Sequence, residues 1–220
     1  MLPTLFSTAL LLGLLPSTEA PTKEQIQTWI QGLASEQDAQ HATLLTKAWP
    51  HARGAVIAAL TRHEQPAVRG WCARILGDHG GEIEQRALAR SATADGLPRV
   101  RAVALQQLSK RPDAIYAETL RALLEWENER GNLITLLGLV ERSGDEELAA
   151  PLLAAIESRF DAEGKRAGFA SLRKLTRTTL ADDVGVWRSW IDARAQEREE
   201  QAERERDGGD DDPGGDSGGG

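Results

Sequence analysis

The chain has 220 residues, of which 40% are hydrophobic and 27% are charged, and this length suits one domain of ordinary size with terminal extensions. Its formal net charge is −8, and its single cysteine excludes both a disulfide framework and a cysteine-based zinc site. Residues 196–220 carry ten acids against three bases, whereas residues 21–195 are neutral with 23 of each. This balance gives no net attraction for nucleic acid, although the arginines are numerous enough to form a local basic face.

The first predicted element is an export signal at residues 1–20. Residues 5–15 read LFSTALLLGLL, an apolar run that has the length of a signal-peptide core and is too short to span a membrane. Thr18 and Ala20 are small residues at the two positions that a signal peptidase reads. However, no Lys or Arg precedes the run and Pro21 would follow the cut, so an apolar first helix packed on the body is the alternative. The pattern predicts a periplasmic or extracellular protein, or a cytoplasmic one if this segment is not a signal.

From residue 21 onward the sequence predicts a body made of helices. Ala, Leu, Glu, Arg and Gln dominate, and the alternation typical of a half-buried strand is absent. Thr22 and Gln25 have the spacing of a capping box, and Pro50, Pro66 and Pro98 stand where helices are expected to begin. We expect helices at residues 23–34, 36–48, 51–63, 66–77, 82–93, 98–109, 114–127, 131–142, 145–159, 164–176 and 183–206.

Local capping signals predict where individual helices start and stop. Gly77 and the two glycines at 80 and 81 are expected to end the fourth helix, because glycine readily adopts the left-handed conformation of a helix C-cap. Asp113, Asp145 and Asp182 are expected to cap the helices that follow them. The short helices and connections of two to six residues are typical of stacked antiparallel helix pairs.

A repeat of about 32 residues runs through the body. The motif that starts at Pro66 recurs at Pro98, and its members are Pro66, Val68, Arg69, Cys72 and Leu76 in the first copy and Pro98, Val100, Arg101, Ala104 and Leu108 in the second. The apolar members lie on one face of a helix. One short helix pair cannot bury such a face alone, so neighbouring pairs are expected to share a continuous core.

This P-x-V-R-x-x-A/C-x-x-x-L pattern resembles the second helix of HEAT or HEAT-like repeats. The resemblance implies an all-α fold over residues 21–195, an α-solenoid of stacked antiparallel helix pairs with no sheet. In that family the arginine commonly ties a repeat to its neighbour through an acid in the preceding turn, a role for which only Glu64 and Asp95 are placed here. Trp187 and Trp190 are similar to a tryptophan pair that closes the stack in some bacterial HEAT-like proteins.

The sequence contains no pattern that indicates catalysis, a metal or a cofactor. The four histidines are not spaced as helical metal ligands, and no phosphate-binding glycine loop or nucleophile motif is present. Cys72 lies on the apolar face of its helix and is expected to be a buried small hydrophobic residue. We therefore expect a protein that is not an enzyme, with no catalytic, metal-binding or cofactor-binding residues.

Arg69 and Arg101 are the candidate partner-binding residues. They recur once per repeat, and a row of guanidiniums on the inner surface of a stack can bind an acidic partner segment. The alternative role for these two arginines is bracing between adjacent repeats.

The HEAT-like resemblance implies a non-catalytic scaffold that binds another protein through its concave surface. The partner and the oligomeric state are open, and neither nucleic acid nor an integral membrane span is expected. Two alternatives remain open, an accessory or lyase-like HEAT-repeat subunit of an enzyme system and a HEAT-like nucleic-acid-binding protein.

The last segment, residues 196–220, is predicted to be a charged helix extension followed by a disordered, acidic, glycine-rich tail. Glu200 and Arg204 form an i, i+4 pair in the favourable order. The composition of residues 207–220 cannot bury enough apolar surface to fold. This tail is either a tether or acidic docking segment, or a solubilising end.

Overall fold

The computed structural model of the chain describes residues 20–110 and 117–207. Within these residues it is entirely helical, with no β-strand, which confirms the predicted all-α class. The predicted export signal up to residue 19, the cap at Asp113 and the tail from residue 208 lie outside the described residues. The helices are α1 (Lys23–Gly32), α2 (Asp38–Lys47), α3 (Arg53–Arg62), α4 (Pro66–His79), α5 (Glu82–Ala94), α6 (Pro98–Ser109), α7 (Ala117–Trp126), α8 (Arg130–Ser143), the short 3-10 helix η2 (Glu146–Leu148), α9 (Ala149–Ser158), α10 (Ala162–Thr176) and α11 (Val184–Asp207).

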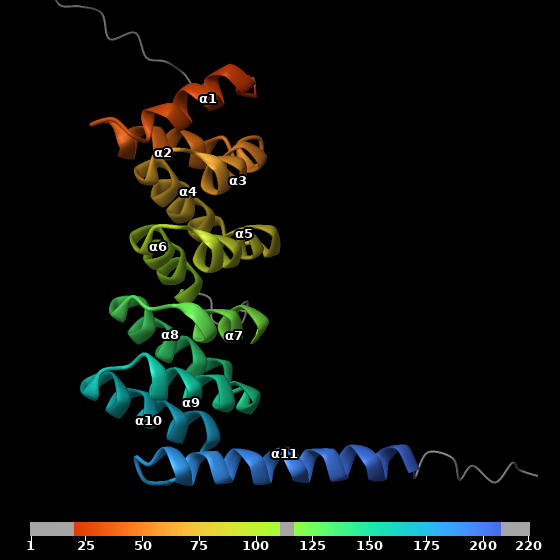
Figure 1. The fold of residues 1–220 in the computed structure, drawn as a ribbon. Helices are drawn as coiled ribbons and strands as arrows, with labels where there is room; N and C mark the ends of the chain where they lie inside the picture. The colour runs from red at the N-terminus through yellow and green to blue at the C-terminus, as the bar shows by residue number, and fades with distance from the viewer. Residues whose placement is uncertain (1–19, 111–116, 208–220) are drawn as a thin grey trace, which may run out of the picture.

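The helices form two layers along the length of the stack (Figure 1). The even layer consists of α2, α4, α6, α8 and α10, and each of these helices contacts the next one in the same layer. The odd layer consists of α1, α3, α5, α7 and α9, which contact one another in the same way, and α11 packs on α9. Contacts between layers join α1 to α2, α3 to α4, and so on to α9 and α10. This packing is consistent with a helical repeat in which each pair contacts its neighbours.

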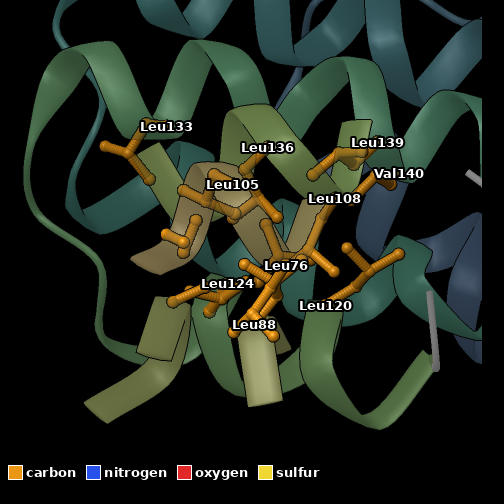
Figure 2. Packing of buried hydrophobic residues seen from close by; sticks show 14 of the residues in the cluster. Leu76, Leu88, Leu105, Leu108, Leu120, Leu124, Leu133, Leu136, Leu139 and Val140 are labelled. Atoms are coloured by element: carbon orange, nitrogen blue, oxygen red, sulfur yellow. The ribbon is translucent and has the colours of Figure 1, made fainter. Parts of the chain in front are cut away.

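One apolar core runs between the two layers. Figure 2 shows its middle part, where Leu76, Leu88, Leu108, Leu120 and Leu136 come together from five successive helices of the stack. All five side chains are almost completely buried. Burial of one such side chain contributes ~1.5–3 kcal/mol, so the continuity of the core links each helix pair to the next.

The local start signals explain several helix boundaries. Thr22 and Gln25 form the predicted capping box, in which the Thr22 hydroxyl accepts from the Gln25 amide and the Gln25 side chain accepts from the Thr22 amide. Pro66 and Pro98 stand at the first positions of α4 and α6, where a missing N–H costs nothing. Asp145 caps η2, because its carboxylate accepts from the amide of Glu147 at 3.0 Å.

Of the glycines predicted to end α4, Gly80 does so and Gly77 does not. The helix continues through His79 to a C-cap at Gly80, which has the left-handed φ of 60° that favours glycine. Gly77 is buried inside the helix, where a Cβ would overlap the side chain of Gln107 in α6. A glycine at this position therefore lets α4 and α6 approach each other closely.

Two further start signals are also wrong. Pro50 lies in the turn before α3, which begins at Arg53. Asp183, rather than Asp182, caps α11, because its carboxylate accepts from the amide of Val186 at 2.9 Å. Asp182 instead forms an ion pair with Arg173 of α10.

The last helix closes one end of the core and then leaves it. Trp187 is fully buried and meets Trp190 edge-on, with their ring centroids 5.9 Å apart, as expected for a pair that seals the final helices. Every side chain from residue 192 to residue 206 is exposed, and Figure 1 shows this part of α11 extending beyond the stack. Arg204 donates to Glu200 at 3.1 Å, which confirms the predicted i, i+4 pair.

Candidate functional site

The even layer carries the excess positive charge of the helix stack. Its five helices contain eleven Lys and Arg against four Asp and Glu. The five helices of the odd layer contain six of each. Residues 21–195 are neutral as a whole, so this separation of charge becomes visible only when each helix is assigned to its layer.

Arg69 joins two successive loops of the stack. Its Nε and Nη2 atoms donate to the two carboxylate oxygens of Asp95 at 2.7 and 2.9 Å, and its Nη1 donates to the backbone oxygen of His63 at 2.8 Å. The side chains of Arg69 and Asp95 are only 13% and 6% exposed. The hydrogen bonds that Arg69 donates to Asp95 raise the pKa of Arg69, so this guanidinium stays charged and in place.

Arg101 makes the same contacts one repeat later. Its Nε and Nη2 atoms donate to Glu127 at 2.8 and 2.7 Å, and its Nη1 donates to the backbone oxygen of Asp95 at 3.0 Å. Glu127 also accepts from the backbone amides of Asn128 and Glu129 and from the side chain of Asn132.

The environment of Glu127 keeps this buried side chain ionised. Burial by itself raises the pKa of Glu127, but the hydrogen bonds from Arg101, the Glu129 amide and Asn132 outweigh it and lower the pKa to about 2. The carboxylate is therefore a permanent negative charge inside the stack, paired with Arg101.

These geometries correct the expected partner of each arginine. The acid that binds Arg69 is not in the preceding turn but lies 26 residues later, and the same separation joins Arg101 to Glu127. The reason is that the first turn of each even helix lies beside the loop that precedes the next even helix. The contacts of Arg69 and Arg101 brace neighbouring helix pairs, and their expected role in binding a partner stays a prediction.

Arg130 and Arg173 of the even layer form ion pairs, but four other arginines of this layer are exposed and form none that the structure describes. Arg99, Arg142 and Arg166 make no ion pair with any residue that the structure describes, and Arg74 rests on the ring of Trp71 at 4.9 Å from its centroid. By contrast, all four acids of these helices already have polar partners: Asp38 with Trp71, Asp78 with Lys110, Glu141 with Lys174, and Glu163 with Arg130. The charge that remains unpaired on the helices of the even layer is therefore positive.

A groove of about 680 Å³ lies on the even layer between α6 and α8. One wall contains Arg99, Val103 and Gln106 of α6, and the other contains Gly131 and Thr135 of α8. The groove exists because the α8 residues that face it are small, and a Cβ on Gly131 would meet nothing within 4 Å. It offers apolar surface, amide groups and a guanidinium side by side, a combination suited to holding a peptide segment.

The series of arginine–acid pairs ends at Arg159, a partly buried cation. Position 133, which continues the series 69 and 101, is Leu133, and position 159, which continues 95 and 127, is Arg159. Arg159 donates to the backbone oxygen of Leu124, but its Nε and Nη1 atoms are buried with no partner among the described residues. Burial lowers the pKa of Arg159, so the charge is held at a cost to stability.

A second polar cluster lies at the end of α4. The ring of His79 stacks on Trp49 with centroids 4.0 Å apart and planes 8° apart. Nearby, the buried Glu84 pairs with Arg53 at 2.9 Å. Burial lowers the pKa of His79 against the opposing influence of Glu84 and Asp78, so the imidazole is biased toward its neutral form.

The remaining sequence candidates occupy structural positions. Cys72 is fully buried, as expected, and burial raises the pKa of its thiol to about 12, which makes it unreactive as a nucleophile. Among the described residues, no group of three or more His, Cys, Asp or Glu side chains is arranged to hold a metal ion. The helices within 20–110 and 117–207 are all too short or too polar to cross a membrane.

Sequence reasoning missed the separation of charge between the layers and the groove, although the 32-residue period contained part of the signal. Adding 32 to Lys110 gives Arg142, and adding 32 again gives Lys174, so the bases recur with the period of the repeat. Comparison with known proteins adds nothing to this picture: no family model, curated protein or solved structure matches the chain.

Proposed function

We propose that this protein is a non-catalytic scaffold that binds another protein through its even layer. The observation that carries the proposal is the separation of charge, eleven bases against four acids in the even helices and six against six in the odd ones. Folding alone gives no reason for an excess of positive charge to collect in one layer, whereas electrostatic complementarity to a partner does.

The proposal includes an α-solenoid of stacked antiparallel helix pairs, of the kind that HEAT-like repeats form. Supporting this are the contacts between helices of the same layer and the two ion pairs of identical 26-residue separation. The proposal assigns the concave surface of the stack to the even layer, which consists of the second helix of each pair. The shared core holds them in fixed relative positions, so a partner meets a preformed surface.

The proposed location is outside the cytoplasm, in the periplasm or the extracellular space. Support for this comes from the apolar run at residues 5–15 and the small residues Thr18 and Ala20. The mass of the N-terminal peptide of the protein purified from its native host tests this part separately, and a chain that starts at Met1 contradicts it.

Two glycines provide a matched test of the binding surface. Gly131 in α8 and Gly54 in α3 each stand second in their helix after an arginine, and a Cβ at either meets nothing within 4 Å. Gly131→Trp fills the groove on the even layer, while Gly54→Trp adds the same side chain to the odd layer.

The experiment crosslinks the tagged full chain in its native host and compares the captured proteins by quantitative mass spectrometry. We expect at least one protein that the wild type and Gly54→Trp retain and that Gly131→Trp loses. Equal recovery of every captured protein by both variants, with both variants folded by circular dichroism, contradicts binding through the even layer.

A further inference from the structure

The even layer has a second regularity, a row of bases with one member on each of three successive helices. Lys110 caps the C-terminus of α6, Arg142 lies in the last turn of α8, and Lys174 lies in the last turn of α10. Consecutive members are 32 residues apart, one repeat. Bases at these positions also stabilise the negative ends of the helix dipoles, which explains their placement but not their exposure.

All three bases are accessible to a ligand. Lys110 and Lys174 are 50% and 65% exposed, and Arg142 is exposed with no ion pair to any described residue. Lys110 contacts Asp78 at 3.3 Å and Lys174 contacts Glu141 at 3.0 Å. Exposed ion pairs of this kind contribute little, so a ligand carboxylate can replace them readily.

The surface beside the row is lined by small side chains. The groove wall on α6 includes Ala102 and Val103 and reaches Ser109, which directly precedes Lys110. The facing wall includes Gly131 and Thr135 of α8 and also Glu129, an acid that the segment must avoid. A Cβ on Gly138 of α8 would meet only the guanidinium of Arg142, at 3.7 Å. A main chain can therefore lie across the helices with its side chains reaching the row of bases.

We propose that the even layer binds an extended acidic polypeptide segment that crosses α6, α8 and α10 and presents an acidic side chain to each of Lys110, Arg142 and Lys174. This inference rests on the proposed function and specifies the chemistry of its partner. Packed helices lie 8–10 Å apart, and an extended polyproline II chain rises about 3.1 Å per residue with three residues per turn, so that every third side chain points the same way. Acidic side chains at every third residue, about 9 Å apart, therefore match the row.

The same geometry disfavours nucleic acid. The three bases of the row are one helix spacing apart, whereas duplex DNA carries one phosphate charge for about every 1.7 Å of its axis. The opposite ends of the same helices carry acids, including the exposed Glu129 before α8 and Glu163 in the first turn of α10. A phosphate backbone would meet these acids, while a peptide need direct its carboxylates only toward the row.

The test uses two fluorescein-labelled peptides of one composition, one with Glu-Ser-Ser repeated four times and the other with four Glu followed by eight Ser. Binding to the full-length protein is measured by fluorescence anisotropy at low and at physiological salt. We expect the spaced peptide to bind more tightly than the block peptide. Equal affinities for the two peptides overturn the proposed spacing.

Matched variants locate the binding site. The row variant Lys110→Gln/Arg142→Gln/Lys174→Gln removes three bases from the even layer. The control variant Arg62→Gln/Arg90→Gln/Arg121→Gln removes three exposed bases from the odd layer, with the same change in net charge. The row variant is expected to weaken the spaced peptide roughly tenfold, the sum of three exposed ion pairs, and the control variant to leave it unchanged.

Each remaining outcome decides between the possible explanations. Equal weakening by the two triple variants overturns the site, because net charge alone then explains the binding. If a 20-base-pair DNA duplex binds more tightly than the spaced peptide, and the row variant abolishes that binding, the acidic segment is overturned as the ligand and nucleic acid takes its place. No binding of either peptide, alongside a partner that Gly131→Trp loses, overturns this inference and leaves the proposed function standing. Arg142→Gln alone, which breaks no ion pair, repeats the test if the triple variant does not fold.

Discussion

The carboxylate of Glu127 lies fully buried against the guanidinium of Arg101, with two donor–acceptor distances of 2.8 and 2.7 Å. This pair joins the first turn of α6 to the loop before α8, and the equivalent pair of Arg69 and Asp95 joins α4 to the loop before α6. Both pairs cross from one helix pair to the next, so they fix the relative position of neighbours in addition to the apolar core.

Removal of one member of the buried pair is expected to destabilise the protein strongly. Glu127→Leu leaves the buried guanidinium of Arg101 without its carboxylate, and we expect this variant to lose about 3–5 kcal/mol of unfolding free energy. The double variant Arg101→Met/Glu127→Leu removes both charges and is expected to recover most of this loss. Urea unfolding measures both values. The exposed pair of Glu82 and Arg86 is the control, because Glu82→Leu should cost less than about 1 kcal/mol. A loss at Glu127 as small as that at Glu82 contradicts the bracing role.

The same pair predicts sensitivity to acid. The pKa of Glu127 is lowered from 4.5 to about 2 in the folded protein, so the folded state holds this proton less tightly than the unfolded chain does. Its contribution to stability is complete above pH 4.5 and is lost as the pH falls toward 2. Over that window, the unfolding free energy of the wild type is expected to fall more steeply than that of Arg101→Met/Glu127→Leu. Parallel pH profiles for the two proteins would show that Glu127 titrates normally.

His79 is expected to lower stability in weakly acidic solution. Burial lowers its folded pKa below 6.5, so below that pH the unfolded chain binds more protons and the unfolding free energy decreases. Two carboxylates, Glu84 and Asp78, favour the charged imidazole, and Arg53 opposes it. His79→Phe keeps an aromatic ring against Trp49 and removes the titration, so its stability profile between pH 5 and pH 8 should be flatter than that of the wild type. If the unfolding free energy of His79→Phe depends on pH as steeply as that of the wild type, a group other than His79 causes the loss of stability in acid.

Arg159 is expected to be a site where substitution stabilises the protein. Two of its guanidinium nitrogens are buried with no hydrogen-bond partner among the described residues, and the attraction of Glu125 offsets the burial of the charge only in part. Arg159→Met therefore removes a poorly compensated charge and keeps most of the side-chain volume. We expect a gain of about 1 kcal/mol in unfolding free energy, measured with urea. Arg166→Met in α10, where the side chain is exposed, is the control and should change stability by less than about 0.5 kcal/mol. A loss of stability at Arg159 would instead show that its hydrogen bond to Leu124 and the attraction of Glu125 outweigh the cost of burial.

Much of the fold could be predicted because its signals are local. The capping box at Thr22 and the prolines that begin α4 and α6 act within a few residues, and the apolar spacing of each helix repeats every three or four. The errors at Gly77 and Asp182 arise where a tertiary contact decides the outcome. Gly77 meets Gln107 of α6, and Asp182 is drawn to Arg173 of α10.

The candidate site was less accessible to sequence reasoning, because it depends on which helices share a face. Arg69 and Arg101 stand out in the sequence as repeated arginines, yet their charges are already matched by Asp95 and Glu127 inside the stack. The unengaged Arg142 belongs to a row that only the 32-residue period and the layer assignment together reveal.

The most direct test of the account is a photocrosslinking comparison between two exposed isoleucines. Ile134 in α8 of the even layer is 51% exposed and Ile83 in α5 of the odd layer is 54% exposed, so the two sites are equally accessible. A benzophenone amino acid replaces each in the full chain within its native host, and the irradiated products are identified by mass spectrometry. The account predicts a specific protein adduct at position 134 and none at position 83. Adducts at position 83 alone, or the same adducts at both positions, would place recognition away from the even layer.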